Sequence, residues 1–265
     1  MRSCLKLLCL LGLFVSIATV CLGQGVKEVR KTVPLPPDGT VSIDTFKGSL
    51  TVTAWDNPQV EVYARVEPDG ESPYEAEKVQ NTEIRIETSG NAIRIKSDYD
   101  KVSQRNSGAF NEDGSLPLVN YTILMPRTAR LEIKDHKSKT TVTGLKAAVN
   151  INTFKGSVAV AGLEGSIDLQ TFKGDAKVVF AGLHSESHFD TNKGNIEVII
   201  PRGGGFNLQS NLGRRGGLDS SIDLRSLSQG KPGYKQAENY AGPVNGGGPL
   251  LRVSTDKGHI RLSQS

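Results

Sequence analysis

Cationic side chains recur at one place in a short repeated motif of this 265-residue chain. The motif is Thr-Phe-Lys-Gly in its most regular copies, and the cations at or near its lysine position are Lys137, Lys155, Lys173, Lys193 and Arg214. If the copies stack, ammonium groups about 5 Å apart repel by only about 1 kcal/mol in water, so a strip of them is tolerated. The strip would offer an anionic polymer many weak contacts. The competing interpretation is that each lysine protects a sheet edge from pairing with other chains.

Phenylalanine occupies the position before the lysine in three copies of the motif, at Phe46, Phe154 and Phe172. A row of aromatic rings can line a sugar-binding surface. Rings at equivalent positions of stacked strands more often pack on one another and stiffen the stack. The sequence therefore favours a packing role for this row.

A histidine pair with a nearby carboxylate is the only arrangement that suggests a metal site: His184, His188 and Asp190. The alternation of the segment argues against it, because Phe189 aligns with inward-facing residues of the other copies and His188 then faces outward. We expect a solvated pair and no metal ligands. His136 and His259 fall at corners, where solvated polar residues are expected.

The motifs of common enzymes are missing from the sequence. There is no Gly-x-Ser-x-Gly elbow for a hydrolase, and the Gly-rich runs at 202–205 and 213–217 lack the Lys-Ser/Thr ending that binds phosphate. Asp44, Asp168 and Asp190 recur at an outward position and predict a surface ladder instead of a catalytic dyad. The sequence thus predicts a non-enzymatic protein with no catalytic residues and no cofactor.

The repeated motif also predicts the fold. The last residue of each copy, which is usually glycine, marks its position. From Ser138 onward these residues lie 18, 18, 20 and 19 positions apart, and another copy follows an insertion. Glycine supplies the positive φ expected at a corner, and the predicted structural corners are Gly48, Gly156, Gly174, Gly194, Gly213 and Gly258. Alternation on both sides of each corner predicts an all-β, parallel β-solenoid of roughly 18–20-residue coils. An antiparallel sandwich of similar hairpins would explain the alternation but not the constant corners.

Three regions follow the leader in this interpretation. Residues 24–130 predict a more irregular β region, continuous with the solenoid, with a hairpin around Ser89-Gly90-Asn91 and a long exposed loop from Tyr99 to Pro117. Residues 131–265 form the repeat solenoid. Residues 216–249 within it are Gly-rich without apolar periodicity, which predicts an inserted loop.

Residues 1–23 have the pattern of a cleaved signal peptide, with Arg2 and Lys6 before an apolar run that ends near Gly23. A membrane helix is a rival interpretation, although the run is short, and acylation of Cys21 is another. Cleavage would remove all three cysteines and lower the formal net charge from +4 to +2, because two cations and no acids are lost. We expect a secreted, periplasmic or envelope-exposed protein whose near-balanced charge argues against nucleic acid as a partner.

Several ordered motifs carry a resemblance to a known family. They are Gly-Ser-Leu-Thr-Val-Thr-Ala-Trp-Asp at 48–56, Tyr-Thr-Ile-Leu-Met-Pro at 121–126, and the repeated Thr-Phe-Lys-Gly-x-Val-x-Val-x-Gly-Leu. Over most of residues 30–264 the chain resembles the bacterial putative-adhesin domains of unknown function. The resemblance implies a secreted or envelope-exposed β-solenoid-like domain and offers no catalytic residues.

The expected function is therefore that of a non-enzymatic, adhesin-like protein, not integral to the membrane after cleavage. Its surface strip or inserted loop would bind an envelope polysaccharide or another surface protein. The first alternative is an assembly role through the ends of the solenoid, which Lys139 and Arg261 could blunt. A carbohydrate-active enzyme is less favoured, because it needs acids that converge in one cleft.

Overall fold

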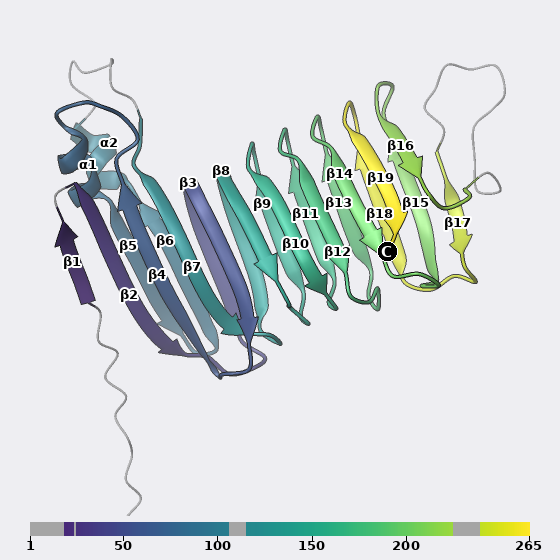
Figure 1. The fold of residues 1–265 in the computed structure, drawn as a ribbon, viewed down its shortest axis with the longest axis horizontal. Coiled ribbons are helices and arrows are strands. Elements are labelled where there is room, and N and C mark those ends of the chain that lie inside the picture. Colours follow the sequence, from purple (N-terminus) through teal and green to yellow (C-terminus); the bar gives the residue numbers. More distant parts are fainter. Residues whose placement is uncertain (1–18, 24, 106–114, 225–238) are drawn as a thin grey trace, which may run out of the picture.

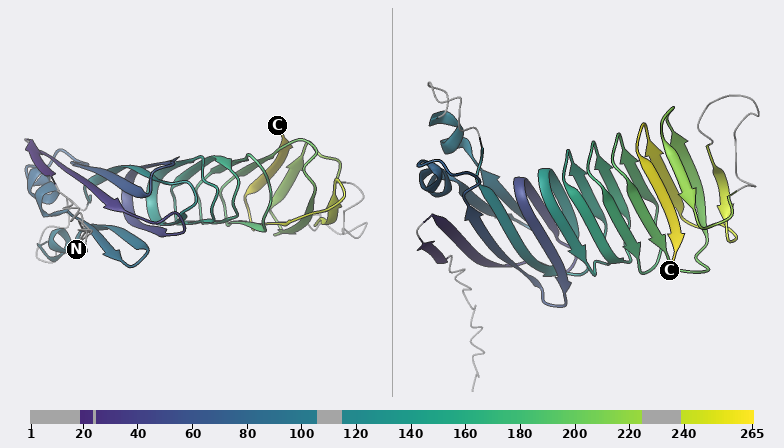
Figure 2. Two further views of the ribbon diagram at one scale, coloured as in Figure 1. Left: turned by 90° about the horizontal axis from the view of Figure 1, so that it is seen from below. Right: turned by 45° about the horizontal axis from the view of Figure 1, so that its top comes forward.

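The computed structural model describes residues 19–23, 25–105, 115–224 and 239–265, and their structure is almost entirely β (Figure 1). Hydrogen-bonded ladders link all of the described strands into one sheet that curls on itself. Two views in Figure 2 show an elongated body with two sheet faces joined at rounded corners. The predicted fold class, a parallel β-solenoid preceded by an irregular β region, is confirmed.

The N-terminal region combines antiparallel and parallel pairs. Its elements are β1 (Thr19–Gly23), β2 (Val26–Pro34), β3 (Thr40–Trp55), β4 (Gln59–Glu67), α1 (Glu75–Asn81), β5 (Glu83–Ser89), β6 (Ala92–Asp98), α2 (Asp100–Arg105) and β7 (Leu118–Pro126). The predicted hairpin is confirmed as the antiparallel pair of β5 and β6, with Gly90 at φ 58°. Two short helices at this end of the body were not expected. One of them, α2, lies in the segment that the sequence predicts as a loop, and residues 106–114 of that segment lie outside the described part.

The solenoid begins at β8 (Arg130–Thr143). The strands that follow are β9 (Val149–Thr153), β10 (Ser157–Leu163), β11 (Ile167–Thr171), β12 (Ala176–Phe180), β13 (Ser187–Thr191), β14 (Ile196–Ile200), β15 (Phe206–Leu212), β16 (Gly217–Ser220), β17 (Ala241–Val244), β18 (Leu250–Thr255) and β19 (His259–Gln264). One face stacks β8, β9, β11 and β13 in parallel, and the other stacks β8, β10, β12 and β14. Equivalent residues meet directly, as in the series Ile133, Ile151 and Leu169.

Two long strands join the N-terminal region to the solenoid. Strand β3 pairs in parallel with β8 along nearly its whole length, from Thr40 opposite Arg130 to Thr53 opposite Thr143. The first half of β3 also pairs with β6, and its second half pairs with β7. The copy of the motif at Lys47 is therefore the coil next to the one at Lys137, although 90 residues separate them in the chain.

The last coil is not at the end of the stack. Strand β18 lies between β13 and β15, and β19 lies between β14 and β16, in parallel on both sides. The C-terminal segment thus inserts between two coils that precede it in sequence, as the yellow strands in Figure 1 show. The linear coil order implied by the sequence is wrong at this point, because spacing along the chain does not specify which neighbour a returning segment pairs with.

The inserted segment is also more structured than the predicted loop. Residues 216–249 contain β16, which extends the second face, and β17, which pairs antiparallel with β15. Leu224 and Val244 from this segment are buried. Residues 225–238 lie outside the described part. The expectation that residues 216–249 form a simple loop is therefore wrong for the two described parts of this segment.

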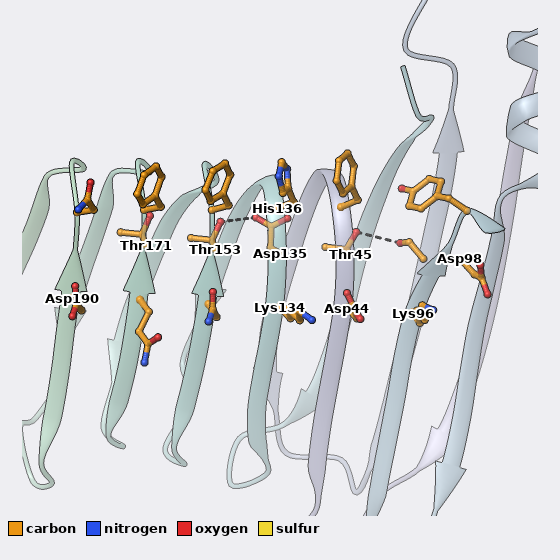
Figure 3. A pocket seen from close by; sticks show the side chains of 18 of the residues that line it. Asp44, Thr45, Lys96, Asp98, Lys134, Asp135, His136, Thr153, Thr171 and Asp190 are labelled. Atoms are coloured by element: carbon orange, nitrogen blue, oxygen red, sulfur yellow. Dashed lines mark hydrogen bonds between the residues drawn. The ribbon is translucent and has the colours of Figure 1, made fainter. Parts of the chain in front are cut away.

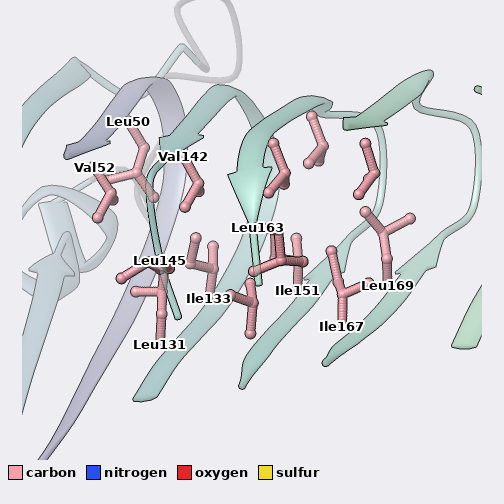
Figure 4. Close-up of a cluster of buried hydrophobic side chains, with 14 of the residues drawn as sticks. Leu50, Val52, Leu131, Ile133, Val142, Leu145, Ile151, Leu163, Ile167 and Leu169 are labelled. Atoms are coloured by element: carbon pink, nitrogen blue, oxygen red, sulfur yellow. The ribbon is translucent and has the colours of Figure 1, made fainter. Parts of the chain in front are cut away.

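The core is a double row of apolar side chains between the two faces (Figure 4). Strands such as β9 and β15 alternate buried and exposed residues along their whole length. Leu50, Val142, Leu145, Ile151 and Leu163 are fully buried in this row. Burial of each such side chain stabilises the fold by about 1.5–3 kcal/mol, and because each coil supplies only one inward row per face, it depends on its neighbours for that burial.

Candidate functional site

One corner of the coil repeats the same backbone geometry from coil to coil. The amide of Lys155 donates to the carbonyl of His136 at 2.8 Å, Lys173 to Phe154 at 3.0 Å, and Lys193 to Phe172 at 3.0 Å. Lys257 and Arg215 continue the same pattern, and Lys47 lies directly opposite Lys137. The corner therefore carries a lysine column, which runs in spatial order through Lys47, Lys137, Lys155, Lys173, Lys193, Lys257 and Arg215.

The lysine column contains the predicted strip with two additions and one correction. Lys47 belongs to a regular copy near the start of the chain and Lys257 to a looser copy after the insertion, and sequence order alone places both too far from the other copies to be included. Arg214 does not lie at the lysine position of the column. Leu212 pairs with Thr255 and Gly217 with His259, so Arg215 takes the lysine position and Arg214 is one extra residue.

Glycine closes the corners between β9 and β14 for a reason other than the predicted one. Gly156, Gly174 and Gly194 do not have positive φ. A Cβ added to Gly174 would lie well under 3.0 Å from the carbonyl oxygen of Gly156, and one added to Gly194 would meet the carbonyl of Gly174 in the same way. Crowding between stacked corners therefore requires glycine, and Gly258 continues this column against Gly194.

The predicted positive φ is confirmed at the corner in the middle of β3, where Gly48 has φ 128° and lies opposite Ser138. Positive φ also occurs at the opposite corner of the coil, in Gly144 and Gly162, with φ 78° and 68°. The predicted corner at Gly213 is wrong by three residues, because the pairing of Gly217 with His259 sets Gly216 opposite Gly258. Gly213 instead takes the position that phenylalanine has in the regular copies, where its amide donates to the carbonyl of Thr255 at 2.7 Å.

A buried hydroxyl fixes each regular corner from inside. The amide of Gly174 donates to Oγ1 of Thr171 at 2.9 Å, and the same bond joins Gly194 to Thr191 at 2.9 Å. Asp135 takes the threonine position in β8, and its Oδ2 accepts from Oγ1 of Thr153 at 2.8 Å (Figure 3). Because these bonds repeat, successive corners have one shape, and the side chains that follow leave the backbone in equivalent directions.

The central lysines of the column are exposed and lack acidic partners. Lys137, Lys155, Lys173 and Lys193 are all exposed, and no carboxylate of the described residues lies within 4.0 Å of their ammonium groups. At the N-terminal end, Lys47 is bonded to Asp69. Burial and, next, the charge of Lys137 hold the pKa of Lys47 below its usual value. Positive charge is therefore concentrated in the four middle coils.

Aromatic rings form a second column beside the lysines. Phe46, His136, Phe154 and Phe172 stack in this order with ring centroids 4.5, 5.0 and 4.9 Å apart and interplanar angles of 11°, 29° and 1°. Tyr99 contacts the other side of Phe46 edge-on at 6.3 Å. His136 thus fills the gap in the phenylalanine row. The expectation from the sequence that His136 is a solvated corner residue is therefore wrong.

The stacking decides between the two interpretations of the aromatic row. Each inner ring presents both faces to its neighbours, so the rings expose their edges, and Phe46, Phe154 and Phe172 remain 37%, 39% and 37% exposed. Sugars stack on ring faces, and both faces of the inner rings, His136 and Phe154, are occupied. Lys193 Nζ also lies 5.7 Å from the centroid of Phe172, a cation–π distance. The row packs on itself and supports the lysine stems.

A shallow groove of about 780 Å³ runs along the other side of the aromatic column (Figure 3). Its carboxylates outnumber its cations: the acids are Asp44, Asp98, Asp100, Asp135 and Asp190, against Lys96 and Lys134. The backbone amide of Asp100 donates to Asp98 and holds the pKa of its carboxyl below the usual value. The charge of Arg85 lowers this pKa further, whereas burial acts in the opposite direction. Asp98 is thus an ionised structural group, bonded to Arg85 at 2.5 Å, and is unsuited to donate a proton.

The residues weighed as metal ligands do not come together. His188 Nδ1 lies 3.6 Å from Asp168 Oδ1 on the neighbouring strand. His184 lies against Gly182. Within the described part of the chain, no three His, Cys, Asp or Glu side chains form a group that could hold a metal ion. Among the same residues, no helix has the length and apolar character needed to cross a membrane.

Comparisons with known proteins place the chain in a family. No curated protein matches the sequence. One similar solved structure is a putative cell adhesion protein from Clostridium sporogenes, with 10% sequence identity and a TM-score of 0.48 over 89% of this chain and 99% of that one. Another is a putative adhesin from Bacteroides fragilis, with 11% sequence identity and a TM-score of 0.34 over 90% of this chain and 97% of that one. The Toastrack DUF4097 family model matches residues 38–262. The chain therefore belongs to the Toastrack DUF4097 family.

Proposed function

We propose that this protein is a non-enzymatic, adhesin-like protein that is secreted or exposed in the cell envelope and binds an anionic envelope polymer through its lysine column. One observation carries the proposal: Lys137, Lys155, Lys173 and Lys193 are exposed, stacked in register and without acidic partners. The adhesin-like resemblance of the sequence motifs and the leader at 1–23 support the location.

The column suits a polymer better than a small molecule. Each exposed cation contributes only a fraction of a kcal/mol to an ion pair in water. Several such contacts along one chain add up, and they are held in place because the corners are rigid. Binding of this kind has no deep pocket and weakens as salt screens the charges.

Export fits the arrangement of the first strands. Cleavage near Gly23 would remove β1, which pairs only with β2 among the described strands, and would take away Cys21 with it. The rest of the body would keep its pairing, because β2 also pairs with β4 from Lys27 to Pro34. The processed protein would then have no cysteine.

Charge removal within the column tests the proposal. Lys155, Lys173 and Lys193 are replaced together by Gln, and binding to immobilised polygalacturonate, polyphosphate and polyglutamate is measured at low and moderate salt. We expect the parent to bind at least one polymer, with an affinity that falls as salt rises, and the triple variant to lose most of that binding.

A matched variant separates local from total charge. Replacement of Lys101, Arg127 and Lys146 by Gln removes the same charge from three cations that are paired with acids elsewhere on the surface. This control should bind like the parent. Equal loss in both triple variants, or salt-independent binding by the parent, would contradict a role for the column.

A further inference from the structure

We infer that the polymer is a linear acidic polysaccharide with one carboxylate on each sugar, lying along the solenoid axis with successive carboxylates on successive residues of the lysine column. The inference rests on the proposed function and makes it more specific. It depends on the spacing of the cations, on their chemistry and on the groups at both sides of the column.

The spacing is set by the stack. Parallel strands lie about 4.8 Å apart, and the ring separations of 4.5–5.0 Å in the adjacent column show that the corners keep this repeat. A pyranose unit in an extended chain has about this length, so a chain with one charge per sugar has the same charge spacing along its axis as the lysine column. Along a stacked nucleic-acid strand the charges advance by only about 3.4 Å of helix axis per phosphate, so they lose register with the column.

The cations are of the type that suits single carboxylates. Six positions of the column are lysine and only the last, Arg215, is arginine. An ammonium group is a compact charge with three donors on a flexible stem, whereas arginine has the planar fork that fits phosphate in bidentate fashion. A column built to hold phosphates tightly would use the fork more than once.

Polar side chains lie on one side of the column, one residue past each corner glycine. They are Ser157, Asp175, Asn195 and His259, all exposed, and they line a second groove of about 780 Å³. Hydroxyl, carboxylate, amide and imidazole groups together both donate and accept hydrogen bonds. These groups match the hydroxyls on the edge of a sugar chain, which a polyphosphate lacks.

Negative charge on the other side restricts the ligand to a narrow path. Beyond the aromatic column lie the groove acids, with Asp44 and Asp190 at outward positions of β3 and β13. An anionic membrane or a double-stranded nucleic acid is wide enough to meet these acids as well as the lysines, and like charges oppose that contact. A single polysaccharide chain fits on the lysine column alone.

The length dependence of binding tests the register. Galacturonate oligomers from two to ten sugars are titrated into the purified full chain at low salt. We expect affinity to rise by about two- to fivefold with each added sugar, because each sugar adds one exposed ion pair. The rise should stop once the oligomer covers the four exposed lysines without acidic partners, from Lys137 to Lys193. Oligomers with methyl-esterified carboxylates should not bind.

A single substitution in the middle of the column gives the second readout. Lys173→Gln should leave the affinity of short oligomers within twofold and reduce that of long ones several-fold, because only long chains must cross that coil. Lys146→Gln removes the charge of a lysine that lies outside the column and both grooves, where Lys146 pairs with Glu164 at 3.1 Å, and should change neither.

The outcomes separate the two proposals. Polyphosphate or anionic phosphatidylglycerol vesicles that bind as tightly as polygalacturonate at equal charge, or an affinity that does not depend on oligomer length, would overturn the uronate register and leave the anion-binding column in place. If none of these probes binds, both proposals fail. Strong length dependence that Lys173→Gln abolishes, with weak binding of polyphosphate and vesicles, would support the register.

Discussion

At the scale of single residues, the corner is a small repeated unit with divided roles. A buried threonine accepts the amide three residues on, an aromatic ring stacks on its copies, a lysine points outward, and a glycine leaves room for the carbonyl of the coil beside it. The motif Thr-Phe-Lys-Gly could be found from the sequence, but the reason for its glycine could not. A repeated glycine is compatible with positive φ or with close approach, and only the stacked backbone distinguishes the two.

Substitution of a corner glycine tests the close approach. Gly174→Val should destabilise the fold by about 1–3 kcal/mol or more, because the new Cβ overlaps the carbonyl of Gly156 and the stack must spread. The free energy of unfolding is measured by urea denaturation. Ser157→Val, at an exposed strand position, is the control and should change the value by less than about 0.5 kcal/mol. A Gly174 variant as stable as the parent would show that adjacent corners are not in contact.

At the scale of elements, the repeat predicted the coil but not its connections. The 18-residue spacing between Ile133, Ile151 and Leu169 is the register of the strands, so the solenoid followed directly from the sequence. The position of β18 and β19 did not, because a segment that returns after a long insertion matches more than one neighbour equally well. Helices α1 and α2 were missed, since each is only about two turns long and has little periodicity to detect.

Truncation tests the inserted last coil. In a chain that ends after Pro249, β15 and β16 lose β18 and β19, their parallel partners. We expect hydrogen exchange to show lost amide protection in β15 and β16 as well as at the new end, while β9 to β12 stay protected. β15 keeps its antiparallel partner β17, so β16 is the decisive strand. If β16 kept its protection, it would have to pair with β14 directly, and the observed coil order would not be required for its folding.

At the scale of the whole molecule, total charge hides an uneven distribution. A formal net charge of +4 for the full chain suggested no strong electrostatic preference, yet the fold sorts the charges into parallel lines. Lysines occupy one side of the aromatic column and a surplus of carboxylates the other. Lys137, Lys155, Lys173 and Lys193 could be predicted from the sequence. Lys47, Lys257 and Arg215 could not, because the long β3–β8 pairing and the inserted coil bring them into line.

The most direct test of the account is the chemical reactivity of its lysines. The full chain is treated briefly with an acetylating reagent, with and without polygalacturonate at low salt, and the modification of each lysine is quantified by mass spectrometry. We predict that Lys137, Lys155, Lys173 and Lys193 are protected together by the polymer, that Lys101 and Lys146 react as before, and that moderate salt removes the protection. Polymer binding that leaves the four column lysines as reactive as in the free protein would contradict the account.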